Sequence, residues 1–250
     1  MKFEEKIKQK YLYSDKQNLF KKIYFFFQKI KSYKFIKKSF SGSAQDLIIN
    51  HFFKDQKEGF YIDVGCYHPF INNNTKLFHK KGWSGINIDL DYHTIDFFNH
   101  VRKTDENIHI AISDEETEKE LYFFHNRSAI NSLDPKRKNE AKETKKVQTK
   151  KLDSIIENSK FKERKINFLS IDVEGHEYEV IKSFNLQKYS PEIILIEFID
   201  SNAKSTNFID QNLNTIIESK IYKHMIKYNY HFVNWLHNDL IFAHNSVRNK

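Results

Sequence analysis

The chain has 250 residues, 39% of them hydrophobic and 30% charged, which excludes a largely disordered protein and predicts one large globular domain with an extension. Twelve lysines and three acidic residues give residues 1–40 a net charge of +9; since the whole chain carries +8, the remainder carries −1, and a near-neutral main domain argues against nucleic acid as a partner. The single cysteine excludes internal disulfide bonds and cysteine-rich metal sites. The charged start is unlike a secretory signal, and no apolar run reaches the roughly 20 residues that span a bilayer. We therefore expect a cytoplasmic protein.

Residues 1–42 are predicted to form a basic, amphipathic, helical extension before a main domain at 43–250. Within Leu19–Phe40, apolar side chains recur at helical spacing with lysines between them: Phe20, Ile23, Tyr24, Phe27 and Ile30. One interpretation is a helix whose aromatic stripe packs on the main domain. The other is a peripheral helix on an anionic membrane surface, contacting it through residues 1–40. Nucleic acid ranks third, because base stacking needs aromatic rings exposed along a groove.

From Ser43 the sequence alternates between helix and strand patterns, which is typical of an α/β domain. A helix over 43–55 with Ser43 as its N-cap precedes a strand over 60–65, and Asn74 or Thr75 begins a helix that Gly82 ends. The next predicted elements are a strand at 84–90, a helix at 92–103, a strand at 107–113, one or two strands within 121–133, a helix at 152–159, a strand at 166–173, a helix at 177–184 and a strand at 191–198.

Residues 134–147 are rich in charge and lack apolar periodicity, so we predict an exposed loop there, the alternative being a mobile lid. The strand at 191–198 is continuously apolar, as expected for a buried central strand of a parallel sheet. Residues 230–233 and 239–243 flank a short loop, which predicts an antiparallel hairpin at one edge of the sheet.

Three predicted strands end in acidic residues: Asp63, Asp89 and Asp172. Ligands of open α/β sheets bind beyond the carboxyl ends of the strands, and a glycine such as Gly65 lets the backbone approach them closely. The separation of Asp63 and Asp89 fits a βαβ unit of a nucleotide-type site. These residues predict an enzyme that binds a nucleoside-bearing cofactor.

Six segments, in this order, resemble the FkbM-type methyltransferases of the class I S-adenosylmethionine-dependent superfamily. They are YIDVGCYHP, NNT, GWSGINIDLD, AIS, INFLSIDVEGHEYEVIKS and PEIILIE, within about 43–200. The resemblance implies a Rossmann-like fold with a mostly parallel central sheet flanked by helices. Two positions depart from common patterns: Cys66, Tyr67 and His68 follow Gly65 in place of a GxG turn, and Ser170 replaces a lysine found in many members.

The resemblance implies that S-adenosyl-L-methionine binds at Asp63, Gly65, Tyr67, His68, Asn74, Thr75, Asp89, Ile112 and Ser113. Asp63 and Gly65 would face the amino acid part of the cofactor, unless Asp63 only caps the next helix. Asp89 would accept hydrogen bonds from the ribose hydroxyls, with Asp91 as an alternative, and Ile112 and Ser113 would face adenine. His68 either contacts a ligand or orders its own loop.

The segment IDVEGHE concentrates candidate catalytic residues: Asp172, Glu174 and His176. In one hypothesis Asp172 or His176 is the general base that takes the proton of an acceptor hydroxyl. In the other, Asp172, Glu174 and Glu197 hold a divalent cation. We favour the hypothesis without a metal, because the sequence shows no complete ligand set.

Two further acidic residues of the same region, Glu177 and Glu179, are expected on a solvated helix face. Glu197 ends an apolar strand, so its carboxylate must be paired or functional.

The expected function is O-methylation of a hydroxyl, by resemblance on a sugar of a surface polysaccharide or glycan precursor, or on a secondary metabolite. The basic N-terminus is compatible with a lipid-linked glycan at the inner membrane face. A catalytically inactive scaffold is disfavoured because the acidic strand ends are intact, and a nicotinamide-dependent oxidoreductase because GxGxxG is missing. Nothing in the sequence indicates an oligomeric state.

Overall fold

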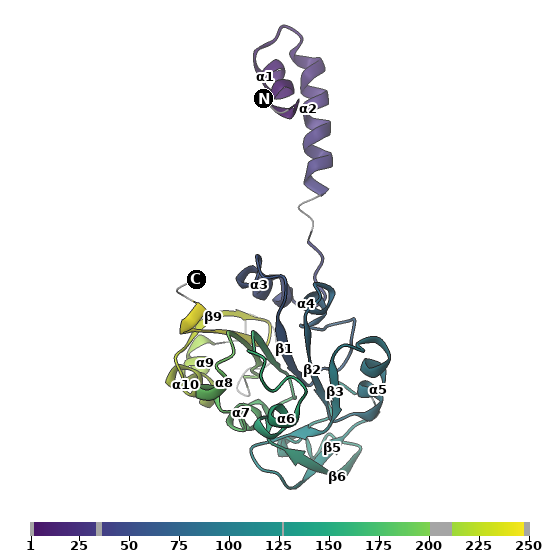
Figure 1. The fold of residues 1–250 in the computed structure, drawn as a ribbon, viewed down its shortest axis with the longest axis vertical. Helices are drawn as coiled ribbons and strands as arrows, with labels where there is room; N and C mark the ends of the chain where they lie inside the picture. Colours follow the sequence, from purple (N-terminus) through teal and green to yellow (C-terminus); the bar gives the residue numbers. More distant parts are fainter. Residues whose placement is uncertain (1–2, 34–36, 127, 201–211, 248–250) are drawn as a thin grey trace. The chain divides into compact units, whose positions relative to one another are not determined.

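The computed structural model describes residues 3–33, 37–126, 128–200 and 212–247 (Figure 1). The chain forms two compact units, Met1–Lys38 and Ser39–Lys250. Within the described residues, no helix combines the length and the apolar character that a membrane span requires.

The first unit is a helical hairpin of α1 (Phe3–Tyr13) and α2 (Gln17–Ser32). Aromatic rings join the two helices: Phe3 packs edge-on against Phe27, and Tyr11 stacks on Tyr24. The prediction of a basic amphipathic helix is confirmed for its central part. Its predicted end was wrong, because residues 37–40 are not helical. The helix α1 lies within the predicted helical extension of residues 1–42, but it was not predicted as a separate helix. Residues 34–36 of the predicted helix lie outside the described residues.

The second unit contains a seven-stranded sheet. Its strand order is β3 (Glu106–His109), β2 (Ser84–Asp89), β1 (Phe60–Val64), β7 (Phe168–Ile171), β8 (Ile193–Glu197), β10 (Asp239–His244) and β9 (Tyr230–Leu236). The first five strands run parallel, and β10 pairs antiparallel with both β8 and β9. The predicted mostly parallel sheet with an antiparallel C-terminal hairpin is therefore confirmed.

Helices cover both faces of this sheet. One face packs against α6 (Leu152–Asn158), α7 (Glu177–Lys182), α8 (Leu186–Tyr189), α9 (Leu213–Glu218) and α10 (Lys220–Lys227). The other packs against α3 (Gln45–Phe52) and α4 (Lys76–Lys80), while α5 (Tyr92–Val101) lies along β2 and β3. Successive residues of β8 enter opposite cores, which explains its continuous apolar run.

A second, three-stranded sheet is built from β4 (Ala111–Ile112), β6 (Glu143–Lys150) and β5 (Glu118–Phe123), with a 3₁₀ turn at Pro135–Arg137. Figure 1 shows β5 and β6 at the lower end of the main sheet. The predicted strand at 107–113 divides here, since β3 pairs with β2 and β4 with β6.

The loop predicted for 134–147 was wrong from Glu143 onward, where the chain forms β6. The charged run becomes a strand because β5 offers partners for it. Lys146 pairs with Glu118 at 2.7 Å, and the ammonium of Lys145 lies 3.1 Å from the centre of the Phe123 ring.

The start of α3 also differs from the prediction. Ala44, with φ of 65°, occupies the N-cap position in place of Ser43. The helix is instead anchored by Ser41, whose hydroxyl accepts a hydrogen bond from the Asp46 N–H at 3.1 Å. The Asp46 carboxylate in turn accepts from the Phe40 N–H at 2.8 Å.

The end of β1 approaches the end of β7 very closely. Gly65 has φ of +81°, and its N–H donates to the Ile88 carbonyl at 2.9 Å. A Cβ at this position would lie 1.7 Å from the carbonyl oxygen of Asp172. Only glycine allows both the backbone conformation and the contact.

We expect Gly65→Ala to lower the free energy of unfolding by about 3 kcal/mol or more, because the obstructing atom belongs to the backbone. Gly82→Ala is the matched control: Gly82 has φ of +93° but no atom within 4 Å of a built Cβ, so only the left-handed penalty of about 1–2 kcal/mol applies. Urea denaturation of both variants measures the difference. Equal losses would show that the β1–β7 contact imposes no steric constraint.

Candidate active site

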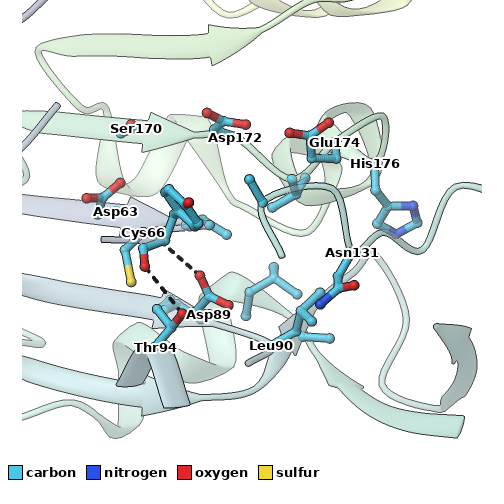
Figure 2. A pocket seen from close by; sticks show the side chains of 18 of the residues that line it. Asp63, Cys66, Asp89, Leu90, Thr94, Asn131, Ser170, Asp172, Glu174 and His176 are labelled. Carbon is cyan, nitrogen blue, oxygen red and sulfur yellow. Dashed lines mark hydrogen bonds between the residues drawn. The ribbon is translucent and has the colours of Figure 1, made fainter. Parts of the chain in front are cut away.

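A pocket lies at the carboxyl ends of β1, β2 and β7, beside the point where the strand order changes direction (Figure 2). Most residues predicted from the sequence line it: Asp63, Gly65, Tyr67, Asn74, Asp89, Ile112, Asp172, Glu174 and His176. His68, Thr75 and Ser113 do not line it and lie behind it or beside it.

Asp63 is buried at the end of β1 and forms part of the floor of the pocket. Its carboxylate accepts hydrogen bonds from Thr75 Oγ1 at 2.9 Å and Asn73 Nδ2 at 3.2 Å. Burial raises the pKa of Asp63, and the positive charge of Arg102 partly opposes that rise. Asp63 does not cap α4, since it bonds to side chains and not to the helix N–H groups.

Arg102 was missed by sequence reasoning. It is only 1% exposed, and its guanidinium donates to Thr75 Oγ1 and Asn73 Oδ1, both at 2.7 Å, and to the Pro69 carbonyl at 2.9 Å. It therefore braces the loop between β1 and α4 and, through Thr75 and Asn73, the carboxylate of Asp63. An arginine after an apolar helix gives no sequence signal that separates this role from a solvated one.

Asp89 ends β2 and is held by backbone N–H groups. One carboxylate oxygen accepts from Tyr67 at 2.9 Å and the other from Asp91 at 2.8 Å. Burial is the largest cause that raises the pKa of Asp89, to about 6. Asp91 is the N-cap of α5 and accepts from the N–H groups of His93 and Thr94, so Asp89 is the better placed of the two for a ligand.

An apolar wall stands beside Asp89. It is made by Ile88, Leu90, Ile110, Ala111, Ile112 and Leu133. Ser113, predicted to face the same ligand group, is buried behind this wall, and its Oγ lies 2.9 Å from His176 Nε2. Ile112 therefore lines the pocket, whereas Ser113 contacts His176, which lines it.

His68 orders its own loop, as the alternative interpretation held. Its Nδ1 accepts hydrogen bonds from the N–H groups of Phe70 and Ile71, both at 3.1 Å. Its ring also packs edge-on against Phe97.

The turn after β7 brings carboxylates together. Asp172, Glu174 and Glu197 each place one carboxylate oxygen within 4.8 Å of the other two. Figure 2 shows Asp172 and Glu174 on the same side of the pocket. Glu174 has φ of 59°, and its carbonyl accepts from Ser132 Oγ at 2.7 Å while its carboxylate pairs with Arg137 at 3.0 Å. The turn is held from several sides.

Glu177 was expected on a solvated helix face, and this was wrong. It is buried, and its Oε1 accepts from the N–H groups of Val173 and Gly175 at 3.0 and 2.9 Å, so it anchors the turn from within. Burial raises its pKa to about 7. Glu179 is half-buried, with Oε2 3.7 Å from His176 Nδ1.

His176 is 8% exposed, and burial lowers the pKa of its imidazole, which Glu179 opposes. A pKa below the ordinary value of about 6.5 keeps the ring neutral at pH 7. The ring can therefore accept a proton there.

A second, open cleft of about 1080 Å³ adjoins the pocket. β5, the 3₁₀ turn and the start of α7 provide much of its wall. Leu133, Glu174 and His176 line both cavities, so a group bound in one can meet a group bound in the other at these side chains.

Comparison with known proteins identifies the fold's family. No curated protein matches the chain. The crystal structure of monomeric WbdD is similar over 80% of this chain and 40% of that chain, with 11% sequence identity and a TM-score of 0.41, a likeness too low to support a functional conclusion. The chain spans less than half the length of that protein. Residues 63–230, however, match the Methyltransferase FkbM domain, from the first acidic strand end to the C-terminal hairpin. This match covers more than half of the sequence, and the chain therefore belongs to the FkbM methyltransferase family.

Proposed function

We propose that this methyltransferase moves the methyl group of S-adenosyl-L-methionine to a hydroxyl of a sugar-containing acceptor, such as a polysaccharide or glycan precursor. One observation carries the proposal: a pocket with acidic and apolar walls meets, at Glu174 and His176, an open cleft lined by charged and aromatic side chains. The first cavity suits the cofactor and the second an acceptor.

The residues of the pocket fit this cofactor. Its ammonium and sulfonium are cationic, and the pocket wall carries the carboxylates of Asp63, Asp89 and Asp172. Each oxygen of Asp89 accepts one backbone N–H and retains a lone pair for a ribose hydroxyl. The apolar wall around Ile112 suits adenine. When bound, the cofactor supplies the methyl group and its leaving group.

We assign to His176 the removal of the acceptor proton. With the hydroxyl hydrogen of Ser113 donated to Asp114, 3.2 Å away, the Ser113 oxygen would accept from Nε2–H of His176, and Nδ1 would carry the lone pair. Glu179, 3.7 Å from Nδ1, would stabilise the ring once it is protonated. General-base assistance of this kind typically contributes about 10²- to 10⁴-fold to the rate.

The open cleft fits a polar acceptor. Its wall combines aromatic rings, among them Tyr122 and Tyr178, with acidic and basic side chains such as Glu140 and Lys136. Aromatic faces and hydrogen-bonding side chains together suit a sugar with many hydroxyls. The volume of about 1080 Å³ also leaves room for more than a single ring.

The helical hairpin supports an acceptor at a membrane surface. Exposed rings of Phe25 and Phe26 lie on α2 among lysines, within a segment of strongly positive net charge. Anionic lipid complements that charge, and the rings can enter the headgroup region. This arrangement fits a lipid-linked glycan at the inner face of the membrane.

We expect saturable binding of S-adenosylmethionine in isothermal titration calorimetry, weakened about tenfold to a hundredfold in Asp89→Ala, because a buried hydrogen-bond acceptor is lost. Asp96→Ala is the matched control, since Asp96 lies exposed on α5 and away from the pocket. A folded wild-type protein that binds no cofactor would favour a catalytically inactive scaffold.

The affinity for the cofactor should also fall as the pH is lowered from 7 to 5. Asp89, with a pKa of about 6, is ionised above that pH and accepts hydroxyl hydrogen bonds best in that form. Asp89→Asn should bind more weakly and with a flatter profile in calorimetry at the same pH values. Parallel profiles for the two proteins would mean that another group controls the pH dependence.

The full chain should bind vesicles that contain anionic lipid and not purely zwitterionic vesicles. Changing Lys21, Lys22 and Lys29 together to Gln should weaken co-sedimentation roughly a hundredfold, at about 1 kcal/mol for each charge. The same change at Lys54, Lys57 and Lys103, exposed lysines of the main unit, is the control. Equal losses in both triple variants would refute a specific role of the hairpin.

A further inference from the structure

The strongest unassigned feature is the carboxylate cluster at the ends of β7 and β8. Ile171 and Ile196 are register partners in the parallel pair, so Asp172 and Glu197, which follow them, leave the sheet side by side. Glu174 joins them from the turn. One carboxylate oxygen of each of the three residues lies within 4.8 Å of the other two. The cluster is thus made by adjacent strand ends and does not depend on a surface loop alone.

A second observation concerns Glu197 itself. Its side chain is 8% exposed, and its Oε2 is buried without a hydrogen-bond partner. Across the described ranges, it is the one carboxylate oxygen in this condition. A buried carboxylate is normally paired, hydrogen-bonded or bound to a metal. Glu197 points into the cluster, where its neighbours are other carboxylates.

Cationic side chains among the described residues offset only part of the charge of the cluster. Among the described residues, Arg137 pairs with Glu174 at 3.0 Å, and neither Asp172 nor Glu197 has a salt bridge. Asp239, opposite Glu197 on β10, adds a further acidic group that is held by Gln45. The site therefore gathers more carboxyl groups than the cationic side chains described around it can pair with.

We propose that Asp172, Glu174 and Glu197 bind one divalent cation of the Mg²⁺ or Mn²⁺ type. The three ligands are all carboxylate oxygens, which hard cations prefer, and the set contains no imidazole or thiolate that would favour zinc. Water would complete the coordination, since Asp172 and Glu174 line the pocket and are half-buried.

The position of the ion suggests its use, and this part rests on the proposed function. Glu174 lines both the cofactor pocket and the acceptor cleft. A cation there would bind an acceptor hydroxyl and lower its pKa, which makes proton removal by a neighbouring base easier. Because the cation would bind the acceptor hydroxyl directly, it would also hold the acceptor in position, which the carboxylates alone do not do.

The test is a titration of the full chain with Mn²⁺, in which electron paramagnetic resonance measures the free ion, followed by competition with Mg²⁺. We expect one ion per chain. Asp172→Asn and Glu197→Gln should each weaken binding about tenfold or more, as expected for loss of a direct ligand. Glu157→Gln, an exposed carboxylate on α6 paired with Lys188, removes the same charge and should change nothing.

Two outcomes would overturn the proposal: no bound Mn²⁺ in the folded wild-type chain, or equal binding by wild type and Glu197→Gln. Either result would show that Glu197 is not a ligand of a divalent cation. Glu174→Gln serves as a further variant. Because the side chain of Glu174 is partly exposed, we expect this substitution to have little effect on folding stability. The Mn²⁺ titration needs no cofactor, and calorimetry with S-adenosylmethionine in the presence of a chelator is independent of the metal. Failure of one proposal is therefore distinguishable from failure of the other.

Discussion

The cost of burying carboxylates at the carboxyl ends of four neighbouring strands governs the architecture of this site. The burial cost is offset in a different way at each place. At the end of β1, Asp63 accepts hydrogen bonds from side chains that the buried guanidinium of Arg102 braces, and at the end of β2, Asp89 accepts from two backbone N–H groups. Beyond β7, Glu177 at the start of α7 accepts from N–H groups of the turn before it. For Glu197 the described residues provide no such partner, and burial together with nearby carboxylates raises its pKa to about 11. The fold stabilises these charges by local pairing except at the place where an external cation would fit.

Local spacing explains why much of this was predictable. The order of strands and helices, the acidic strand ends and the apolar character of β8 all follow from periodicity within short windows. The failures involve partners distant in sequence. Arg102 acquires its role from the loop around Asn73, and β6 becomes a strand through β5. No single-sequence pattern encodes those contacts, because each depends on where another segment lies after folding.

The wall of the pocket at the ends of β1, β2 and β7 also stores backbone strain. Tyr67, Asn72 and Glu174 are not glycines, yet they have φ values of 48°, 49° and 59° and all line the pocket. Each left-handed residue costs about 1–2 kcal/mol, so the remainder of the domain must over-determine these conformations. Their hydrogen bonds do so at two of the positions: Tyr67 donates to Asp89, and the Glu174 carbonyl accepts from Ser132. The backbone of this wall is therefore held in place by contacts within the domain, and a bound molecule would not have to order it.

The small sheet has a different relation to the rest of the domain. The chain leaves the main sheet after His109 and returns to the main core with α6, and between these points β5, the 3₁₀ turn and β6 supply much of the open cleft. The acidic residues Asp63, Asp89, Asp172 and Glu197 all lie outside this insertion. Changes within this segment would reshape the open cleft and leave those four acidic residues in place. Under the proposed function, a different acceptor can therefore be accommodated by altering one peripheral segment, provided that Ile112 and Leu133, which line the pocket from within it, are kept.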